Sequence, residues 1–290
     1  MQIKFSDRLL LALQNCLPAR FMGACLYRLS RSETRWLKNA LIRGFSRLYA
    51  VNTGEAERPV PDGYCSFNDF FTRSLKSGSR PVDPDPLQLA APADGTIAQL
   101  GHAISGRLIQ AKGIDFSAAA LLGDEDLARE LADCAYTTIY LAPYNYHRLH
   151  MPLAGTLEKT LFIPGLLYSV NARSTALVPG LYALNERLVC QFSAPAGRFA
   201  MVLVGAMNVA SISTAWAGEI FPAGDSSIQR HEYPAGSGPT LERGDYMGHF
   251  NMGSTIVLLG PRSMKNWSEH LQVGSTVQVG QAMGRLDNLP

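Results

Sequence analysis

The chain has 290 residues, of which 47% are hydrophobic and 17% charged, and its formal net charge is +2. This length is enough for one large domain with a substantial buried core. Its five cysteines are scattered and show no Cys-x-x-Cys spacing. Neither a disulfide framework nor a thiolate metal site is therefore indicated, and a reducing cytoplasm is the expected compartment.

The charge is unevenly placed. Residues 1–50 contain nine basic and two acidic side chains, a net +7, which leaves −5 for the rest of the chain. Such asymmetry points the N-terminal segment toward an anionic surface. The segment has no nucleic-acid-binding motif, so we expect a membrane surface and no nucleic acid. The apolar run at 9–13 is shorter than the roughly 20 residues of a membrane span, and its flanks do not fit a secretory signal.

Two basic amphipathic helices are predicted in this segment. Apolar residues recur at helical spacing over 9–17, before Pro18, and again over 36–48 with arginines and a lysine between them. Such apolar faces usually pack on the body of a protein. Arginine-rich helices with leucine, tryptophan and phenylalanine also lie at membrane interfaces. We therefore predict that residues 1–60 form a membrane-associating helical segment.

Residues 61–290 are predicted to form a β-rich catalytic domain. A proline-rich connector over 51–90 contains one helical piece at 66–73, and short apolar stretches then alternate with Gly and Pro turns, as at 137–141, 187–192, 201–204 and 256–259. The fold class is α+β, a mainly antiparallel β body with barrel-sandwich-like features.

Three further segments of this domain carry predictions. Residues 117–133 predict a surface helix, and 273–283 a hairpin similar to those of biotinyl and lipoyl carrier domains. No lysine occupies the tip of that hairpin, so carrier function is not expected. The apolar run at 161–168 is the candidate for contact with acyl chains.

Gly253-Ser254-Thr255 precedes an apolar strand. A serine there can attack the carbonyl of the preceding residue, because glycine tolerates the distorted backbone that the attack requires. Alone the tripeptide is an ordinary turn, and 274–276 repeats it. Asp94 could be only a turn former, and His147 and His150 could be core residues or metal ligands. Together they supply a nucleophile, a base and an orienting carboxylate.

These residues stand in motifs that resemble a known family. Asp94 lies in Pro-Ala-Asp-Gly, His147 and His150 lie in Tyr-His-Arg-x-His-Met-Pro, and the Gly-Ser-Thr at 253–255 follows. Together they resemble phosphatidylserine decarboxylase of the bacterial membrane-associated type. Further similarity covers most of the chain, at 67–73, 110–113, 185–187 and 204–206. Met252 departs from the leucine usual before Gly-Ser-Thr but keeps its apolar bulk.

The resemblance implies a self-cleaving proenzyme. Asp94 would orient His150, which would take the proton of the Ser254 hydroxyl. The hydroxyl oxygen would attack the Gly253 carbonyl, and the ester so formed would break by elimination. A β chain of residues 1–253 and an α chain of residues 254–290 would result. Hydrolysis with loss of ammonia would leave residue 254 as a pyruvoyl group.

The resemblance also implies the reaction. The pyruvoyl group would form a Schiff base with phosphatidylserine and take the role that pyridoxal phosphate has in most amino-acid decarboxylases. Phosphatidylethanolamine and carbon dioxide would be the products. His147 would protonate the substrate carbon, a step worth about 10²–10⁴ in rate. The expected location is peripheral, on the cytoplasmic face of the cell membrane, and the expected assembly is a homodimer.

Three other functions stay open at this point. A Ser-His-Asp lipid hydrolase would retain Ser254 as its nucleophile, although the chain lacks a Gly-x-Ser-x-Gly elbow. A non-enzymatic membrane-associated β-sandwich binding module would show neither cleavage nor carbon dioxide release. A pyridoxal-dependent decarboxylase would need a lysine such as Lys112 and would show the absorbance of bound aldimine.

Overall fold

The computed structural model describes residues 19–111, 113–206, 211–220, 227–253 and 255–287. The helix predicted at 9–17 lies outside these ranges, as do Ser254 and Lys112. The described chain is a set of mostly antiparallel sheets with a few helices, which confirms the predicted α+β class. Among the described helices, none is long and apolar enough to cross a bilayer.

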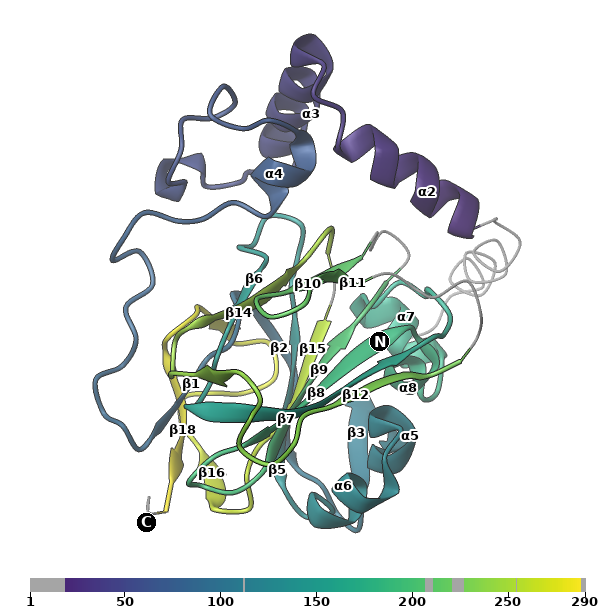
Figure 1. The fold of residues 1–290 in the computed structure, drawn as a ribbon, viewed down its shortest axis with the longest axis vertical. Helices are drawn as coiled ribbons and strands as arrows, with labels where there is room; N and C mark the ends of the chain where they lie inside the picture. The colour runs from purple at the N-terminus through teal and green to yellow at the C-terminus, as the bar shows by residue number, and fades with distance from the viewer. Residues whose placement is uncertain (1–18, 112, 207–210, 221–226, 254, 288–290) are drawn as a thin grey trace.

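Helices α2, α3 and α4 stand together at one end of the molecule, beyond the sheets (Figure 1). We call this unit the helical cap; its elements are α2 (Ala19–Ser30), α3 (Arg35–Leu48) and α4 (Phe67–Phe71), with the short helix η1 (Thr53–Glu55). The predictions at 36–48 and 66–73 are confirmed by α3 and α4. The sequence pattern predicts no helix at α2, because its apolar spacing ends at residue 17 and resumes only at 36.

The helical cap has its own apolar cluster, separate from the main core. The cluster consists of buried side chains from α3, α4 and the segment between them: Ile42, Val51, Tyr64, Phe67, Phe70 and Phe71. Ser66 begins α4, since its hydroxyl accepts a hydrogen bond from the Asp69 N–H, the usual N-cap arrangement.

One large sheet forms the body of the protein. Its strands follow the order β12-β7-β8-β9-β15-β5-β2-β17, and β13 also pairs with β7. Their bounds are β2 (Gly95–His102), β5 (Ala135–Tyr140), β7 (Gly155–Ile163), β8 (Arg187–Ser193), β9 (Phe199–Val204), β12 (Gln229–Glu232), β13 (Thr240–Leu241), β15 (Thr255–Leu259) and β17 (Thr276–Val277). All residues of β9 and β15 are buried, and the strands predicted at 137–141, 187–192, 201–204 and 256–259 are confirmed.

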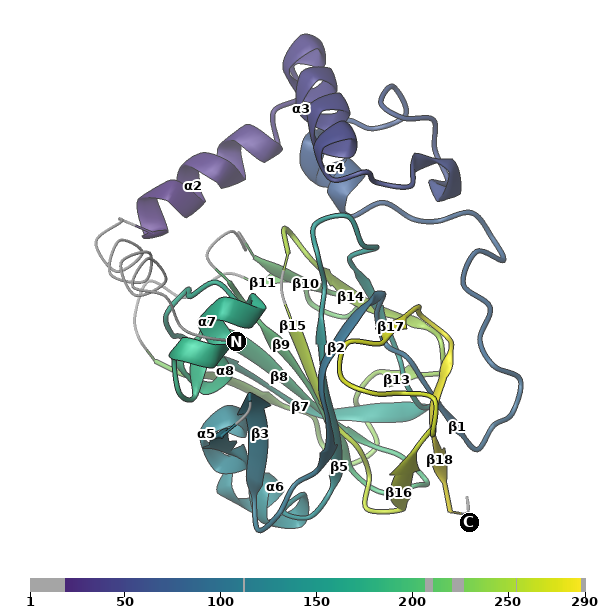
Figure 2. The ribbon, with the colours of Figure 1, turned by 180° about the vertical axis from the view of Figure 1, so that it is seen from behind.

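Smaller sheets and short helices surround this sheet (Figure 2). The sheet β11-β10-β14-β6 consists of Gly218–Ile220, Ile212–Thr214, Tyr246–Phe250 and Arg148–His150. The sheet β1-β18-β16 consists of Gln88–Ala90, Ala282–Leu286 and Met264–Trp267, and β3 (Arg107–Ala111) pairs with β4 (Ile114–Ser117). The remaining helices are α5 (Ala118–Leu122), α6 (Glu125–Glu130), α7 (Ala172–Leu177) and α8 (Leu181–Leu184).

Two predicted elements differ from the structure. The single helix expected at 117–133 is two helices, because Gly123 adopts a left-handed conformation (φ 62°) that ends α5, and Asp124 then caps α6. The hairpin expected at 273–283 was wrong: β17 pairs with β2, whereas β18 lies between β1 and β16. The turn at Gly280 (φ 87°) hydrogen-bonds to Ala91 and carries the chain to a different sheet.

The apolar run at 161–168 has two parts. Leu161, Phe162 and Ile163 end β7 and belong to the main core. Leu166 is half exposed. The apolar character of the first part is therefore explained by burial in the sheet.

Candidate functional site

The predicted cleavage site lies at the entrance to the centre of the main sheet. Thr255 is the first residue of β15 and pairs with Tyr140 of β5 on one side and with Val204 of β9 on the other. Its side chain is fully buried, and its hydroxyl has no hydrogen-bond partner. A Cβ added at Gly253 would meet no atom within 4 Å. Ser254 is outside the described residues; of its two neighbours, Thr255 is fixed in the strand and Gly253 has open space beside it.

A cavity of about 570 Å³ opens at Gly253. One wall comes from the helical cap and the other from the end of β5 and the loops beside it; the lining includes Leu41, Gly44, Phe45, Leu48, Phe67, Phe71, Tyr140, Leu141, Pro143, Ser169, Val170, Ala206 and Met252. Most of these side chains are apolar, as is typical of a site for an apolar ligand. The run at 161–168 does not line this cavity, although Ser169 and Val170 just beyond it do.

His147 lies directly behind the cavity wall. Its ring stacks on Phe71 with 4.1 Å between the centroids, and its Nε2 lies 3.4 Å from the carbonyl oxygen of Pro143; both partners line the cavity. A carbonyl only accepts, so we assign the ring proton to Nε2. The other nitrogen, Nδ1, is buried and has no partner. Its capacity to form a hydrogen bond is therefore unused in this structure.

The charge state of His147 follows from its surroundings. Burial, together with the positive charge of Arg73, lowers the pKa of His147 to about 3, so the free site holds a neutral imidazole at pH 7. Arg73 is itself 3% exposed, and its Nε and Nη1 have no hydrogen-bond partner. Burial lowers the pKa of Arg73 as well. In the sequence, Arg73 stands out only as the last residue of the motif at 67–73.

His150 is held by two hydrogen bonds. Its Nδ1 lies 2.8 Å from the carbonyl oxygen of Gly244, and its Nε2 lies 3.1 Å from the hydroxyl of Tyr146. Nδ1 must carry the proton, because the carbonyl only accepts, and Nε2 then accepts from Tyr146. Burial lowers the pKa of His150, and burial raises the pKa of Tyr146 to about 12. Nε2 is therefore the nitrogen with a lone pair, as a general base requires.

Asp94 is buried near His150 but does not hydrogen-bond to it in this structure. Its carboxylate accepts from Arg80 Nε at 2.9 and 3.0 Å, from Arg80 Nη2 at 2.6 Å and from the Val279 N–H at 2.9 Å. Burial alone would lower the pKa of Arg80, but its hydrogen bonds to Asp94 and Glu55 raise it above its ordinary value. The ring that Asp94 was predicted to orient is held by Gly244 and Tyr146 instead. Asp94 acts on it only at longer range, through its charge.

His249 also belongs to this site, although sequence reasoning grouped it with the dispersed histidines. It lies on β14 opposite Arg148 of β6, and the Tyr246 hydroxyl lies 2.5 Å from its Nδ1. Burial, together with the charge of Arg148, lowers the pKa of His249 to about 4. Tyr246 and His249 stand just before Gly253 in the sequence, and that position could have identified them. Within the described ranges, no three His, Cys, Asp or Glu side chains gather as a metal site.

The other motifs that carried the resemblance support the fold around the site. Arg187 donates three hydrogen bonds to backbone carbonyls, and Gln110 and Asn185 each donate two. All three residues are buried. Their side chains fix loops whose carbonyls would otherwise be buried without partners.

Comparison with known proteins agrees with this geometry. The family model described as phosphatidylserine decarboxylase matches residues 67–285, and a second model, described as PSD, matches residues 9–50. Three similar relatives are each named phosphatidylserine decarboxylase proenzyme. The protein of Hahella chejuensis (strain KCTC 2396) is 42% identical over 281 residues, which are 97% of this chain and 94% of the relative.

The other two relatives are matched over a similar share of their length. The protein of Alkalilimnicola ehrlichii (strain ATCC BAA-1101 / DSM 17681 / MLHE-1) is 46% identical over 275 residues, 93% of this chain and 96% of the relative. That of Azotobacter vinelandii (strain DJ / ATCC BAA-1303) is 44% identical over 282 residues, 96% of this chain and 98% of the relative. The chain belongs to the phosphatidylserine decarboxylase family.

Proposed function

We propose that this protein converts phosphatidylserine to phosphatidylethanolamine and carbon dioxide after cleaving itself between Gly253 and Ser254. The observation that carries the proposal is the position of Gly253, which joins the central strand β15 to an apolar cavity with a buried histidine behind its wall. The names of the relatives, which are proenzymes, support the same conclusion. We also propose a peripheral location on the cytoplasmic face of the membrane and a homodimer.

His150 is the proposed base for self-cleavage. Its Nδ1–H is fixed by Gly244, so Nε2 can exchange the Tyr146 hydroxyl for the Ser254 hydroxyl and accept its proton. The serine oxygen then bonds to the Gly253 carbonyl carbon, and the peptide nitrogen leaves with a proton. Elimination from the resulting ester releases the Gly253 carboxylate, and hydrolysis of the dehydroalanine at residue 254 releases ammonia.

The described residues on either side of position 254, together with His147, are suited to a small polar carbonyl group. The Thr255 hydroxyl and His147 Nδ1 are buried polar atoms without partners, and Gly253 has open space beside it. A pyruvoyl group at residue 254 would supply a ketone that condenses with the substrate amine and accepts the electron pair left by carbon dioxide. His147, Thr255 and the cavity wall would hold the headgroup and keep water from it.

His147 is the proposed proton donor to the substrate carbon. In the free site it is neutral, since its pKa is lowered to about 3. The substrate carboxylate brings a negative charge next to Nδ1, which favours the charged form of the ring and raises its pKa. The proton is therefore taken up with the substrate and is available when carbon dioxide has left.

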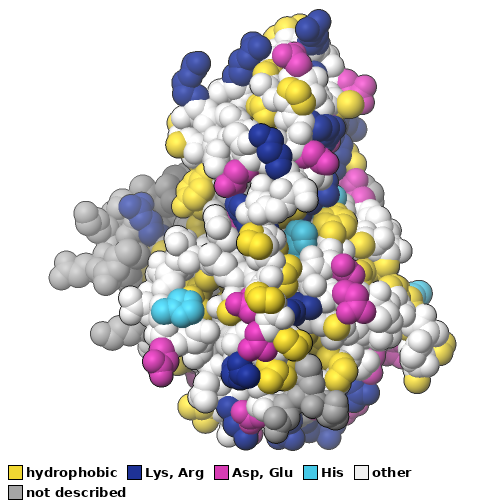
Figure 3. Space-filling view, turned by 90° about the vertical axis from the view of Figure 1, so that its left-hand side faces the viewer, with side chains coloured by type: hydrophobic (Ala, Val, Ile, Leu, Met, Phe, Trp, Pro, Cys, Tyr) yellow, Lys and Arg dark blue, Asp and Glu magenta, His cyan; other side chains and the backbone are white. Residues whose placement is uncertain are grey.

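The helical cap supplies features suited to a membrane surface. Trp36 and Leu48 of α3 are 73% and 75% exposed, and Leu29 of α2 is 43% exposed. Figure 3 shows Lys and Arg side chains spread over the same end of the molecule. Apolar side chains can enter the interface while basic side chains contact anionic headgroups. The cavity opens between this end and the sheet, where a lipid could enter without leaving the bilayer.

The fold would hold the two chains together after the proposed cleavage. β15 of the α chain lies between β9 and β5, which both belong to the β chain. β18 of the α chain pairs with β1 of the β chain on one side and with β16 of the α chain on the other. The Val279 N–H also binds the buried carboxylate of Asp94. Cleavage before residue 254 therefore breaks one bond in a loop and leaves the core intact.

Intact-mass analysis of the purified protein tests the proposal. Cleavage before Ser254 yields an α chain of 37 residues, and use of Ser275 would yield one of 16 residues. We expect the longer fragment, with release of carbon dioxide from phosphatidylserine vesicles. Ser254→Ala should stay at full length and inactive, with Ser275→Ala as the matched control. An unbroken wild-type chain that still decarboxylates the lipid, or a Ser254→Ala chain cut at the same bond, would contradict the proposal.

A further inference from the structure

The backbone just before the proposed cleavage bond is strained. Met252 has φ 105°, a conformation that residues with a side chain rarely adopt. Such a conformation persists only where the surroundings enforce it, and it is frequent at functional sites. Met252 is bonded to Gly253, so whatever enforces its conformation also sets where the chain enters Gly253, whose carbonyl is the proposed point of attack.

The side chain of Met252 packs against the helical cap. Its neighbours belong to the apolar cluster of Ile42, Phe67 and Phe71, which is separate from the core of the main sheet. Met252 also lines the cavity together with Leu41 and Phe45 of α3. The strained residue is thus held by the helices, whereas Thr255 on the other side of the bond is held by the sheet.

Asn251 adds a polar attachment one residue earlier. Its side-chain amide donates to the hydroxyls of Ser211 at 3.0 Å and Ser213 at 2.9 Å, and its carbonyl oxygen accepts from Asn68 of α4 at 2.9 Å. Its backbone N–H donates to the Ser211 carbonyl oxygen at 2.9 Å. Asn251 is 2% exposed, so these bonds do not compete with bulk water.

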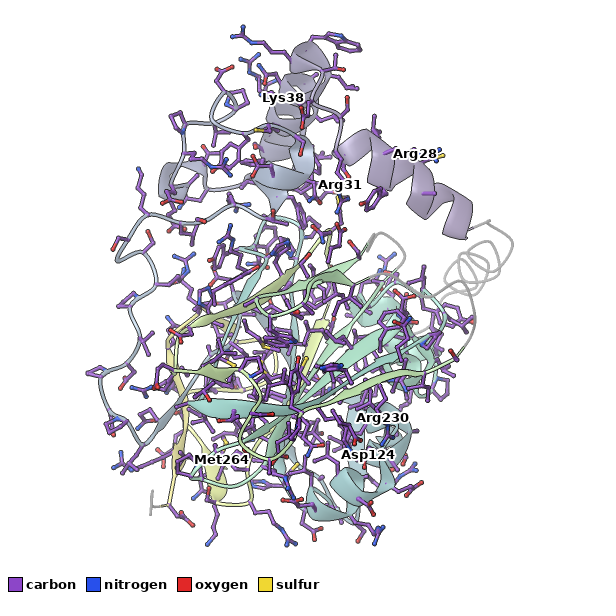
Figure 4. The ribbon with its side chains drawn as sticks, viewed as in Figure 1. Arg28, Arg31, Lys38, Asp124, Arg230 and Met264 are labelled. Atoms are coloured by element: carbon purple, nitrogen blue, oxygen red, sulfur yellow. The ribbon has the colours of Figure 1, made fainter. Side chains whose placement is uncertain are left out.

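The same network reaches the connection between α2 and α3. Glu219 of β11 accepts hydrogen bonds from Ser211 and from Arg31, which follows the last residue of α2. Figure 4 labels Arg31 below the α2–α3 connection, on the side of strands β10 and β11. The Arg31 and Glu219 side chains are 23% and 26% exposed. A continuous set of polar contacts therefore joins the helical cap to Asn251.

We propose that the helical cap positions the Gly253–Ser254 peptide bond for self-cleavage. The cap is attached to this segment in two ways. Met252 packs on the apolar cluster, and a polar network connects Arg31 through Glu219 to Asn251. The proposal rests on the proposed function, because it assumes cleavage at this bond. It makes the cap a part of maturation as well as of membrane contact, and it gives Met252, Asn251, Glu219 and Arg31 the role of positioning residues.

The first test separates packing from backbone strain at Met252. Met252→Leu keeps the apolar bulk and should cleave at the wild-type rate. Met252→Ala loses the packing but keeps the strain and should slow cleavage by roughly tenfold, whereas Met252→Gly loses both and should slow it by roughly a hundredfold, as small misplacements of reacting groups do. The measurement is the appearance of the 37-residue chain over time, by mass, in freshly synthesised protein.

The second test addresses the polar network. Arg31→Gln and Glu219→Gln should each slow the same time course by about tenfold, and Arg31→Lys should retain most of the wild-type rate, because it keeps the charge. Arg35→Gln is the matched control: Arg35 belongs to the same cap and pairs with Asp62 at 3.8 Å, but its side chain is 85% exposed. It should cleave at the wild-type rate.

The outcomes distinguish this inference from the function on which it rests. If the wild-type protein does not cleave, the proposed function itself is contradicted. If the wild-type protein cleaves and Met252→Ala and Arg31→Gln cleave equally fast, only the proposed role of the helical cap is contradicted. Melting temperatures within a few degrees of wild type show that a slow variant is folded. Should Glu219→Gln not fold, Arg31→Gln, a change in a half-buried side chain, decides the point.

Discussion

The tripeptide Gly-Ser-Thr occurs twice in this chain, and its two copies lie in very different surroundings. In the first, Thr255 begins a central strand, is fully buried and has an unpartnered hydroxyl. In the second, Thr276 is exposed and begins β17, a two-residue strand at the edge of the main sheet. The Ser275 hydroxyl accepts from the Gln272 N–H at 3.1 Å and closes a local turn.

The difference shows that the tripeptide alone does not make its serine reactive. The first copy follows a residue with φ 105° and opens on a cavity backed by His147. In the second, the positive φ of 94° falls on Gly274, the first residue of the copy itself, and glycine adopts this conformation freely. A reactive serine requires a base, space and a positioned carbonyl, and these come from segments far away in the sequence.

The largest expected effects come from the two histidines near the first copy. His150→Gln should block cleavage, because it removes the proposed base, whose Nδ1–H is fixed by the Gly244 carbonyl so that Nε2 keeps its lone pair. His147→Gln should cleave normally, with turnover lower by about 10²–10⁴, the usual worth of a positioned proton donor. Mass analysis measures the first effect and carbon dioxide release from lipid vesicles the second.

A histidine outside the site is the control for this pair. His231 of β12 contacts Tyr233 at the sheet edge, so His231→Gln should change neither cleavage nor turnover. The assignment of roles is wrong if His147→Gln stays uncleaved, or if His150→Gln matures at the wild-type rate.

The sequence predicted those parts of the fold and site that depend on local pattern. The apolar runs of β8, β9 and β15 and the periodicity of α3 identified these elements, and the motifs pointed to His147, whose ring stacks on Phe71 in the wall of the cavity that opens at Gly253. The pattern could not identify Arg80 as the partner of Asp94, since a proline-rich connector carries no periodicity. Nor could it pair Arg31 with Glu219, which are 188 residues apart.

The next largest effect concerns the ion pair between Arg80 and Asp94, which lies close to the second copy. Arg80 and Asp94 form a buried ion pair, with side chains 11% and 6% exposed, and Asp94 also binds Val279, shortly after Ser275. Arg80→Met would leave a buried carboxylate unpaired, so the free energy of unfolding should fall by about 3–5 kcal/mol. Urea unfolding in a Ser254→Ala background, where the chain is expected to stay in one piece, measures this loss.

An exposed ion pair provides the matched control. Arg107 and Asp115 lie on paired strands with side chains each 52% exposed, so Arg107→Met should cost less than about 1 kcal/mol. Equal losses for Arg80→Met and Arg107→Met would show that the Arg80–Asp94 pair contributes no more to stability than an exposed ion pair does.

A smaller effect is expected from pH. His147 has a pKa near 3 in the folded chain and near its ordinary value of about 6.5 when unfolded, so between these values only the unfolded chain binds the proton. Stability must therefore fall as pH falls, by about 2 kcal/mol between pH 7 and pH 5 for this one group. His147→Phe, which keeps a ring against Phe71, should lose that part of the slope. Parallel stability curves for the two proteins would mean that His147 is charged in the folded state.

The smallest effect is expected at the second copy itself. Ser275→Ala removes the hydroxyl that accepts a hydrogen bond from the Gln272 N–H. This contact is exposed, so the N–H can donate to water instead, and the free energy of unfolding should fall by no more than about 1 kcal/mol. Cleavage should continue at the wild-type rate and give the same 37-residue chain. Mass analysis and urea unfolding of the same sample measure both quantities. A slower cleavage in Ser275→Ala would mean that the edge strand, through Val279 and Asp94, acts on the reactive centre, and the two copies would then not be independent.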